Sequence, residues 1–260
     1  AAAKTILAQT ALSGSMNRFR WDPTATKALF SFGKWIFVST VFTFFAMQSD
    51  RLLLGKFLTM DVLGVYSIAM MLVMIARAVT DKINGKVLMP ALASKIRTSG
   101  LASCASVIRR TRWILGGAAG CMTLGLALLA PLFFTALYDP RYHDAGWMAQ
   151  LLCVGLWFAT LNAGAGSILL AAGDSRSVAF ATITNTIATF TFAPLGYWHI
   201  GLPGFILGWS VGNACALIML HIGLTRQKIR IYQIDVILSF VIIGILSAIL
   251  ASTTLIFTSA

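Results

Sequence analysis

Charged residues divide this sequence into long apolar runs, and the lengths of those runs predict membrane-spanning helices. Residues 113–138 and 145–173 carry no charge, and each is long enough to cross a hydrocarbon core that needs about 20 residues of helix. Residues 177–225 form an uncharged stretch of double length, which the turn-forming GLPG at residues 201–204 divides into two helices. Residues 236–260 supply a further span.

Two earlier spans are less regular, because their uncharged runs, residues 35–49 and 62–76, reach full length only when charged neighbours are included. The pattern thus predicts a tail or linker at residues 1–27 and a membrane domain at residues 28–260. The chain begins AAAK, without a methionine or a signal-peptide pattern, so we expect its natural beginning to lie upstream. The predicted spans are residues 29–54, 62–86, 113–138, 147–172, 178–199, 204–224 and 235–257.

Composition supports the same class. Hydrophobic residues make up 58% of the chain and charged residues 11%, and the mean hydropathy is +0.84. Soluble domains carry about 25% charged residues, and a chain with less than half of that complement cannot cover a water-facing surface. We therefore predict an all-α integral membrane protein, a bundle of about seven transmembrane helices.

The net charge of +12 raises the question of nucleic-acid binding, but the distribution of the charge predicts membrane topology instead. Sixteen of the 20 basic residues fall in the tail and loops of one side, whereas the opposite side has Arg51, Lys56 and Arg141. This positive-inside asymmetry predicts a cytoplasmic N-terminus and an external C-terminus. The longest loop, residues 88–112, interleaves basic and apolar positions and predicts a surface helix on anionic membrane lipid.

Small and polar residues inside the predicted spans indicate how the helices pack. Glycines recur every four residues in spans three and six, and this spacing lets helix backbones approach closely. Asparagines in spans four to six are expected to hydrogen-bond between helices, or to line a polar cavity, and Pro194 is expected to kink span five. The packing glycines are Gly116, Gly120, Gly204, Gly208 and Gly212, and the asparagines are Asn162, Asn185 and Asn213.

No motif in the sequence predicts catalysis. Residues 31–34 fit S-x-x-K, but the companion motifs that give this tetrad its meaning are missing. The sequence has no GxSxG, HExxH or P-loop pattern, and its four cysteines are scattered without a CxxC pair. We therefore expect a protein that is not an enzyme and that needs no metal or cofactor.

The first third of the chain carries a family resemblance. Together, five strings resemble the oligosaccharide flippase, or polysaccharide biosynthesis, branch of the multidrug/oligosaccharidyl-lipid/polysaccharide exporter superfamily. The similarity is specific over residues 17–95, and beyond them it rests on hydropathy and on short pieces such as LLAAGDSR at residues 169–176. The strings are NRFRWD (17–22), FGKWIFVSTVFTF (32–44), QSDRLLLGKFL (48–58), LGVYSIAMML (63–72) and KVLMPALASK (86–95).

The resemblance implies a fold and a function. Members of this family have two bundles of about six helices around a central cavity, and they move undecaprenyl-pyrophosphate-linked sugars across the cytoplasmic (inner) membrane by alternating access. Such sugars are precursors of lipopolysaccharide or exopolysaccharide. With seven spans, this chain corresponds to roughly the second bundle plus one helix, which is the C-terminal portion of such a transporter.

An anionic substrate head group directs attention to cations inside the predicted membrane domain. Arg77 lies within span two, 16 residues after Asp61, in the cytoplasmic third of the bilayer. Lys34 lies near the start of span one on the same side. The hypothesis is that Arg77, helped by Lys34, binds the pyrophosphate through its bidentate guanidinium. The alternatives are a snorkelling arginine and a lysine that anchors the helix at the interface.

Asp50 and Arg51 form an acid–base pair between two apolar blocks of span one. Neighbouring residues on a helix point in different directions, so each of the two side chains needs its own partner. We expect the pair to form an inter-helix latch towards the external leaflet, or to line the outer part of a cavity.

The sequence therefore predicts a flippase fragment whose partners are lipid-linked oligosaccharide, membrane lipids and, by extension, membrane proteins of glycan synthesis, with no nucleic acid. One alternative is a cation-coupled multidrug exporter of the same superfamily, which needs a membrane acid such as Asp50. Another is a non-transporting scaffold of a glycan-synthesis complex.

Overall fold

The structure is a computed structural model that describes residues 23–99 and 102–258. Within them it is an all-helical bundle in which seven helices are long and apolar enough to cross a membrane, so the predicted fold class is confirmed. The helices are α2 (Pro23–Phe57), α3 (Met60–Ile83), α4 (Met89–Ser99), α5 (Ala105–Leu137), α6 (Ala145–Ala171), α7 (Ser175–Ile200), α8 (Leu202–Arg226) and α9 (Tyr232–Thr258).

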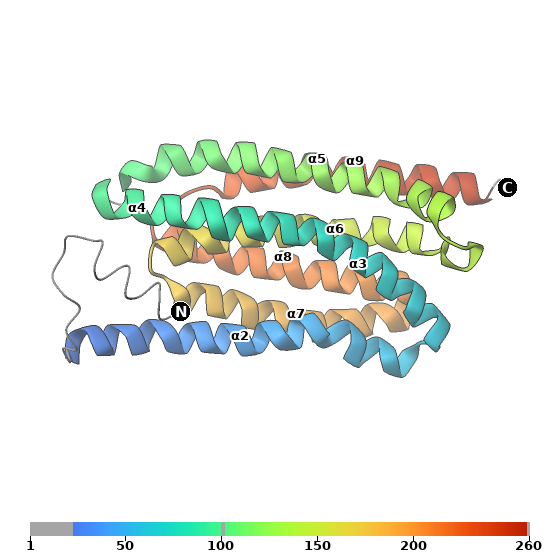
Figure 1. Ribbon diagram of the computed structural model, residues 1–260, viewed down its shortest axis with the longest axis horizontal. Helices are drawn as coiled ribbons and strands as arrows, with labels where there is room; N and C mark the ends of the chain where they lie inside the picture. The colour runs from blue at the N-terminus through green and yellow to red at the C-terminus, as the bar shows by residue number, and fades with distance from the viewer. Residues whose placement is uncertain (1–22, 100–101, 259–260) are drawn as a thin grey trace, which may run out of the picture.

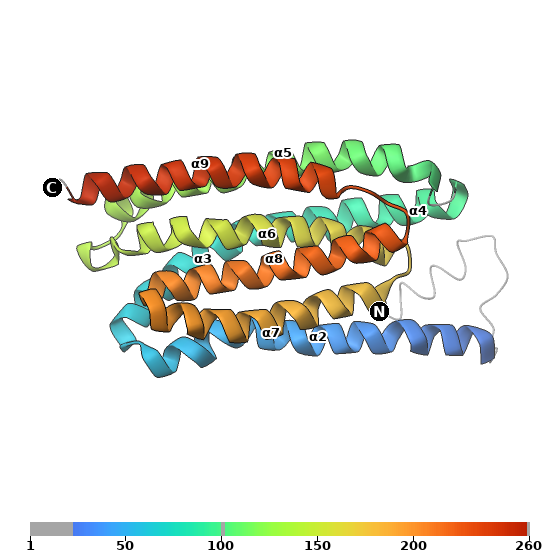
Figure 2. The ribbon, with the colours of Figure 1, turned by 180° about the vertical axis from the view of Figure 1, so that it is seen from behind.

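The helices run side by side along the long axis of the molecule (Figure 1). Helices α5 and α9 form one edge, α2 and α7 form the opposite edge, and α3, α6 and α8 lie between them in both views (Figures 1 and 2). Because the helices alternate in direction, the start of α2 and the connection from α8 to α9 lie at one end of the bundle. The end of α9 and the connection from α5 to α6 lie at the other.

Helix α6 is the central element of the bundle. Leu152, Leu156 and Trp157 on this helix are fully buried, and the helix contributes residues to both apolar cores. A helix that is apolar on all sides is expected at the centre of a bundle rather than at its lipid-facing edge. The edge helix α2 is its opposite, since Phe37 and Phe44 are 69% and 62% exposed.

The basic loop predicted at residues 88–112 is mostly helix in the described part of the chain. A π-helical segment at Asn84–Leu88 joins α3 to α4, so that one apolar helix continues from Met60 to Thr98. Leu92 of α4 is buried in the core instead of facing lipid, and α5 starts at Ala105, upstream of the predicted residue 113. The predicted surface helix is therefore a continuation of α3, because its apolar positions pack against α6.

Two tight turns connect the central helices. Gly201 has φ of +69° between α7 and α8, a backbone conformation that favours glycine, so the GLPG turn predicted at residues 201–204 is confirmed. Gly173 has φ of +82° between α6 and α7. Asp174 then caps α7, since its carboxylate accepts hydrogen bonds from the Ser177 backbone N–H at 3.0 Å and hydroxyl at 2.8 Å.

The five glycines named from the sequence lie where helices approach closely. A Cβ added to Gly116 would meet Leu238 of α9, and a Cβ added to Gly120 would meet Ile242 of the same helix. Gly204, Gly208 and Gly212 face the backbone or short side chains of α7, the first of them opposite Gly196. In lipid, the hydrophobic effect does not drive membrane helices together. Close approach stabilises their packing instead, because it increases van der Waals contact between them.

Candidate functional site

A polar cavity of about 370 Å³ lies inside the bundle, between α2, α3, α6, α7 and α8. Its wall mixes apolar side chains with hydroxyl, amide and charged groups, and such polar groups are costly in a membrane domain. The polar lining residues are Ser39, Thr43, Arg77, Asp81, Asn84, Asn162, Ser167, Thr182, Asn185, Thr189 and Asn213. The polar wall thus extends from α2 and α3 to α6, α7 and α8, and it includes the three asparagines named from the sequence.

Hydroxyl groups of α7 hold α2 against the rest of the bundle. The Thr182 and Ser39 hydroxyl oxygens are 3.2 Å apart. Thr186 donates its hydroxyl proton to the Phe42 carbonyl at 3.0 Å, and Ser175 donates to the Phe32 carbonyl at 3.1 Å. Polar contacts of this kind between membrane helices contribute about 0.6 kcal/mol each.

Arg77 lies in the cavity wall, as the sequence hypothesis requires, but it has a carboxylate neighbour. Its Nε atom is 3.6 Å from Asp81 Oδ2, one helical turn further along α3. That distance is too long for a hydrogen bond, and the buried Nε has no hydrogen-bond partner. The pairing with Asp81 was missed, although the i,i+4 spacing of the two residues signals it in the sequence.

Asn162 of α6 supplies a second open polar group. Its Nδ2 donates to the Asn213 carbonyl of α8 at 2.9 Å, which confirms the expected hydrogen bond between helices. Its Oδ1 is buried without a hydrogen-bond partner. Asn185 accepts a 3.3 Å hydrogen bond from Thr189 within α7 and lines the cavity. Arg77 and Asn162 therefore carry one donor and one acceptor that have no hydrogen-bond partner, on residues that line the cavity.

Lys34 is not among the residues that line this cavity. Its ammonium lies 5.7 Å from the centre of the Trp35 ring on α2, and the Arg176 guanidinium lies 5.4 Å from the same ring. Two cations beside one indole are typical of a membrane interface. The structure therefore does not bring Lys34 together with Arg77.

Asp50 and Arg51 lie in α2 by their backbone. Their side chains are outside the described part of the chain, so their role as a latch or a cavity wall stays a prediction.

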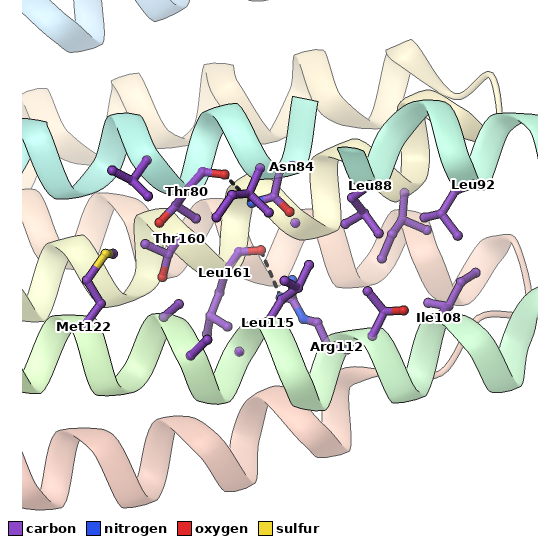
Figure 3. A pocket seen from close by; sticks show the side chains of 18 residues that line it. Thr80, Asn84, Leu88, Leu92, Ile108, Arg112, Leu115, Met122, Thr160 and Leu161 are labelled. Carbon is purple, nitrogen blue, oxygen red and sulfur yellow. Dashed lines mark hydrogen bonds between the residues drawn. The ribbon is translucent and has the colours of Figure 1, made fainter. Parts of the chain in front are cut away.

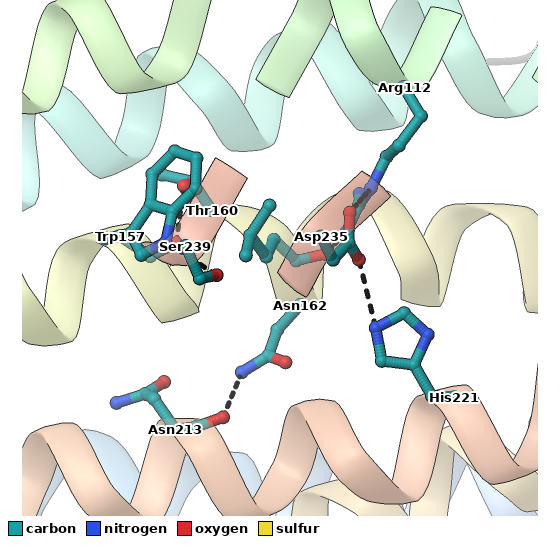
Figure 4. A network of polar contacts seen from close by, with 9 residues as sticks. Arg112, Trp157, Thr160, Asn162, Asn213, His221, Asp235 and Ser239 are labelled. Atoms are coloured by element: carbon teal, nitrogen blue, oxygen red, sulfur yellow. Dashed lines mark hydrogen bonds and ion pairs between the residues drawn. The ribbon is translucent and has the colours of Figure 1, made fainter. Parts of the chain in front are cut away.

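A buried charge network joins α5, α8 and α9 (Figure 4). Arg112 donates from Nε and Nη2 to the two carboxylate oxygens of Asp235, each at 2.6 Å, and from Nη2 to the Leu161 carbonyl at 2.9 Å. His221 Nε2 lies 3.0 Å from Asp235 Oδ2. Arg112 is 6% exposed and Asp235 1%, so the bidentate pair is what makes burial of both charges tolerable.

This network was not predicted from the sequence, because Arg112 was assigned to the loop at residues 88–112 and Asp235 lies just before the uncharged run at residues 236–260. The structure places both residues in helices. Arg112 lies within α5, and Asp235 lies in the first turn of α9. A lone acid at the start of an apolar run was the available signal, since a membrane carboxylate needs a cationic partner.

The comparisons with known proteins bear on the first part of the chain. Residues 3–146 match the model of a family described as polysaccharide biosynthesis protein. No curated protein and no solved structure matches the chain. The family match covers more than half of the 260 residues, and it includes the strings that carry the resemblance as well as α2, α3, α4 and α5. The chain therefore belongs to the polysaccharide biosynthesis protein family.

Proposed function

We propose that this chain is part of a flippase that moves a lipid-linked oligosaccharide, of the undecaprenyl-pyrophosphate type, across the cytoplasmic membrane. The observation that carries the proposal is the polar cavity inside an apolar seven-helix bundle. The described residues of this polysaccharide biosynthesis protein form membrane-type helices and no separate water-facing domain. We therefore expect the protein to act on its substrate within the membrane. The cavity is a polar site that a sugar head group can enter.

The lining of the cavity suits a carbohydrate. Asparagine, serine and threonine side chains both donate and accept hydrogen bonds, and sugar hydroxyls do the same. The open Oδ1 of Asn162 accepts from such a hydroxyl, and Arg77 donates to a phosphate oxygen in place of its long contact with Asp81. The nearby Asp81 carboxylate weakens that phosphate site, and this favours release over tight retention.

Transport requires that the cavity opens alternately to the two sides of the membrane. The bundle corresponds to one half of a two-bundle transporter, and the second half completes the site. In this proposal α2 is the wall that moves, because it lies at the edge of the bundle and exposes much of its surface. In this proposal the N-terminus is cytoplasmic, the C-terminus is external, and no bond in the substrate is made or broken.

Arg77→Ala in the full-length protein tests the proposal. We expect the rate of lipid-linked oligosaccharide flipping in proteoliposomes to fall about tenfold or more, the loss that corresponds to a charge-assisted hydrogen bond. Arg77→Lys retains the charge but not the bidentate geometry, and we expect it to recover part of the rate. The matched control is Arg97→Ala, an exposed cation on α4 outside the cavity.

Flipping at the unaltered rate by Arg77→Ala, at equal protein content, would contradict a role for this cavity in transport. A different result would favour a non-transporting scaffold of a glycan-synthesis complex. In that case the unaltered full-length protein does not flip lipid-linked oligosaccharide in proteoliposomes, although glycan export in cells depends on the protein.

A further inference from the structure

A second cavity, of about 190 Å³, lies between the α3–π–α4 helix, α5 and α6 (Figure 3). Its lining differs from that of the polar cavity, because the two cavities share one lining residue, Asn84 of the π-helical segment. Most of the side chains around it are apolar, and they come from three helices that cross the membrane. They include Val79, Ile83, Leu88, Leu115, Ala119 and Met122.

The mouth of this cavity faces the outside of the bundle. Val79 and Ile83 line the cavity and are also 47% and 41% exposed. Val87 and Ile114, on the helices that form the cavity, are 64% and 60% exposed. In a helix bundle that crosses a membrane, such a surface is in contact with lipid hydrocarbon. The apolar wall of the cavity is therefore continuous with the lipid-facing surface.

Two of the polar side chains in the wall donate hydrogen bonds within the protein. Asn84 donates to the Thr80 carbonyl at 3.0 Å, and the Thr160 hydroxyl donates to the Trp157 carbonyl at 2.7 Å. Arg112, the charged residue of the lining, is neutralised by Asp235 behind it. Most of the lining is nevertheless apolar, and an apolar wall favours an apolar occupant over water.

We propose that this second cavity binds one hydrocarbon chain of an anionic phospholipid. A void forfeits the dispersion contacts of its lining, and a hydrocarbon chain that enters from the mouth restores them along a mainly apolar wall. The charge around the mouth selects the head group. Lys82 and Lys86 on the α3–π–α4 helix are exposed cations that flank the lining residue Ile83 in the sequence, and basic residues of this kind attract anionic lipid.

The test is photo-cross-linking of the full-length protein in lipid nanodiscs, with phosphatidylglycerol that carries a diazirine in its acyl chain. We expect cross-links to concentrate on lining residues such as Val79, Ile83 and Leu115. Ala119→Phe fills the cavity, and we expect it to lower the yield at these positions about fivefold or more, because overfilling an apolar site is costly. Leu129→Phe is the matched control, since Leu129 lies on the same helix, is 61% exposed and does not line the cavity.

Two further variants keep the test independent of folding defects in Ala119→Phe. Leu115→Ala enlarges the cavity, and we expect a higher yield at Val79 and Ile83. Lys86→Gln is expected to lower the yield with phosphatidylglycerol about fivefold, the effect of one basic residue near an anionic surface, and to leave the yield with phosphatidylcholine unchanged.

Cross-links spread evenly over the lipid-facing surface of α5, or equal yields for Ala119→Phe and Leu129→Phe, would overturn the proposal. The readout is lipid binding alone, so its outcome is distinct from that of the flipping assay.

Discussion

At the scale of single residues, charge inside the bundle is either neutralised by another protein group or open to a cavity. Arg112 and Asp235 are bonded to each other, with His221 at the same carboxylate. Arg77 is the contrasting case, because its ion pair with Asp81 is long and its Nε is unbonded. The closed network therefore holds helices together, whereas the open cation is available to a ligand.

The Arg112–Asp235 pair predicts a specific pattern of stability. Arg112→Ala leaves a buried carboxylate without its partner, so we expect the free energy of unfolding to fall by about 3–5 kcal/mol. The double variant Arg112→Met/Asp235→Leu removes both charges, and we expect it to recover most of that loss. Thermal unfolding of the purified protein in detergent measures both. A double variant that is less stable than Arg112→Ala would show that the charges are not coupled in this way.

Gly164 of α6 leaves the space that the Arg112 guanidinium occupies in the same network. A Cβ at Gly164 collides with Arg112 Nη1, and the guanidinium then has to leave the Leu161 carbonyl. We expect Gly164→Ala to lower the unfolding temperature, although alanine is the better helix former. Gly166→Ala on the same helix has no atom within 4 Å of its Cβ, and it is expected to leave the unfolding temperature unchanged or slightly raised.

At the scale of elements, the bundle combines close and loose contacts. Helices α7 and α8 approach so closely that Gly196 and Gly204 lie backbone to backbone. Helix α2 is held to α7 by hydroxyl groups and exposes much of its surface. The α3 helix changes to π geometry at Asn84–Leu88, at the wall between the two cavities, and such segments are frequent at functional sites.

The contact between α7 and α8 predicts the effect of adding one methyl group. A Cβ at Gly208 would lie 2.5 Å from the backbone of Ala193, and the helices have to separate to accept it. We expect Gly208→Ala to destabilise the protein by about 1–3 kcal/mol, the cost of overpacking. Gly244→Ala on α9, where a Cβ meets no atom within 4 Å, is the control. Equal stability of the two variants in a detergent unfolding assay would contradict the close contact.

At the scale of the whole molecule, many basic residues lie near helix ends that share one end of the bundle. Of the sixteen residues assigned to one side, Lys4, Arg18 and Arg20 lie outside the described residues, which leaves thirteen. Among these, the cations at the start of α5 and α7 and at the end of α8 share one end of the bundle. Arg112 differs from the other cations near the start of α5, because it is buried and paired with Asp235.

This grouping predicts the sidedness of the loops. In a cysteine-free background of the full-length protein, Gln227→Cys, after α8, is expected to react with a membrane-impermeant thiol reagent only after cells are permeabilised. His143→Cys, between α5 and α6, is expected to react in intact cells. Labelling gels on the two variants measure this, and the reverse pattern would show that the basic end is external.

The sequence by itself determined the membrane class, the seven spans, the turn at Gly201 and the family, because each depends on local patterns of apolar, glycine and charged residues. It also placed Arg77 inside the membrane domain. Only the tertiary structure decided that Arg77 lies in a polar cavity beside Asn162 while Lys34 does not, and that Arg112 is bonded to Asp235. These facts depend on which helices become neighbours, and Arg112 and Asp235 are 123 residues apart. The hydropathy of a segment predicts that it leaves water, but it does not predict whether lipid or another helix covers it.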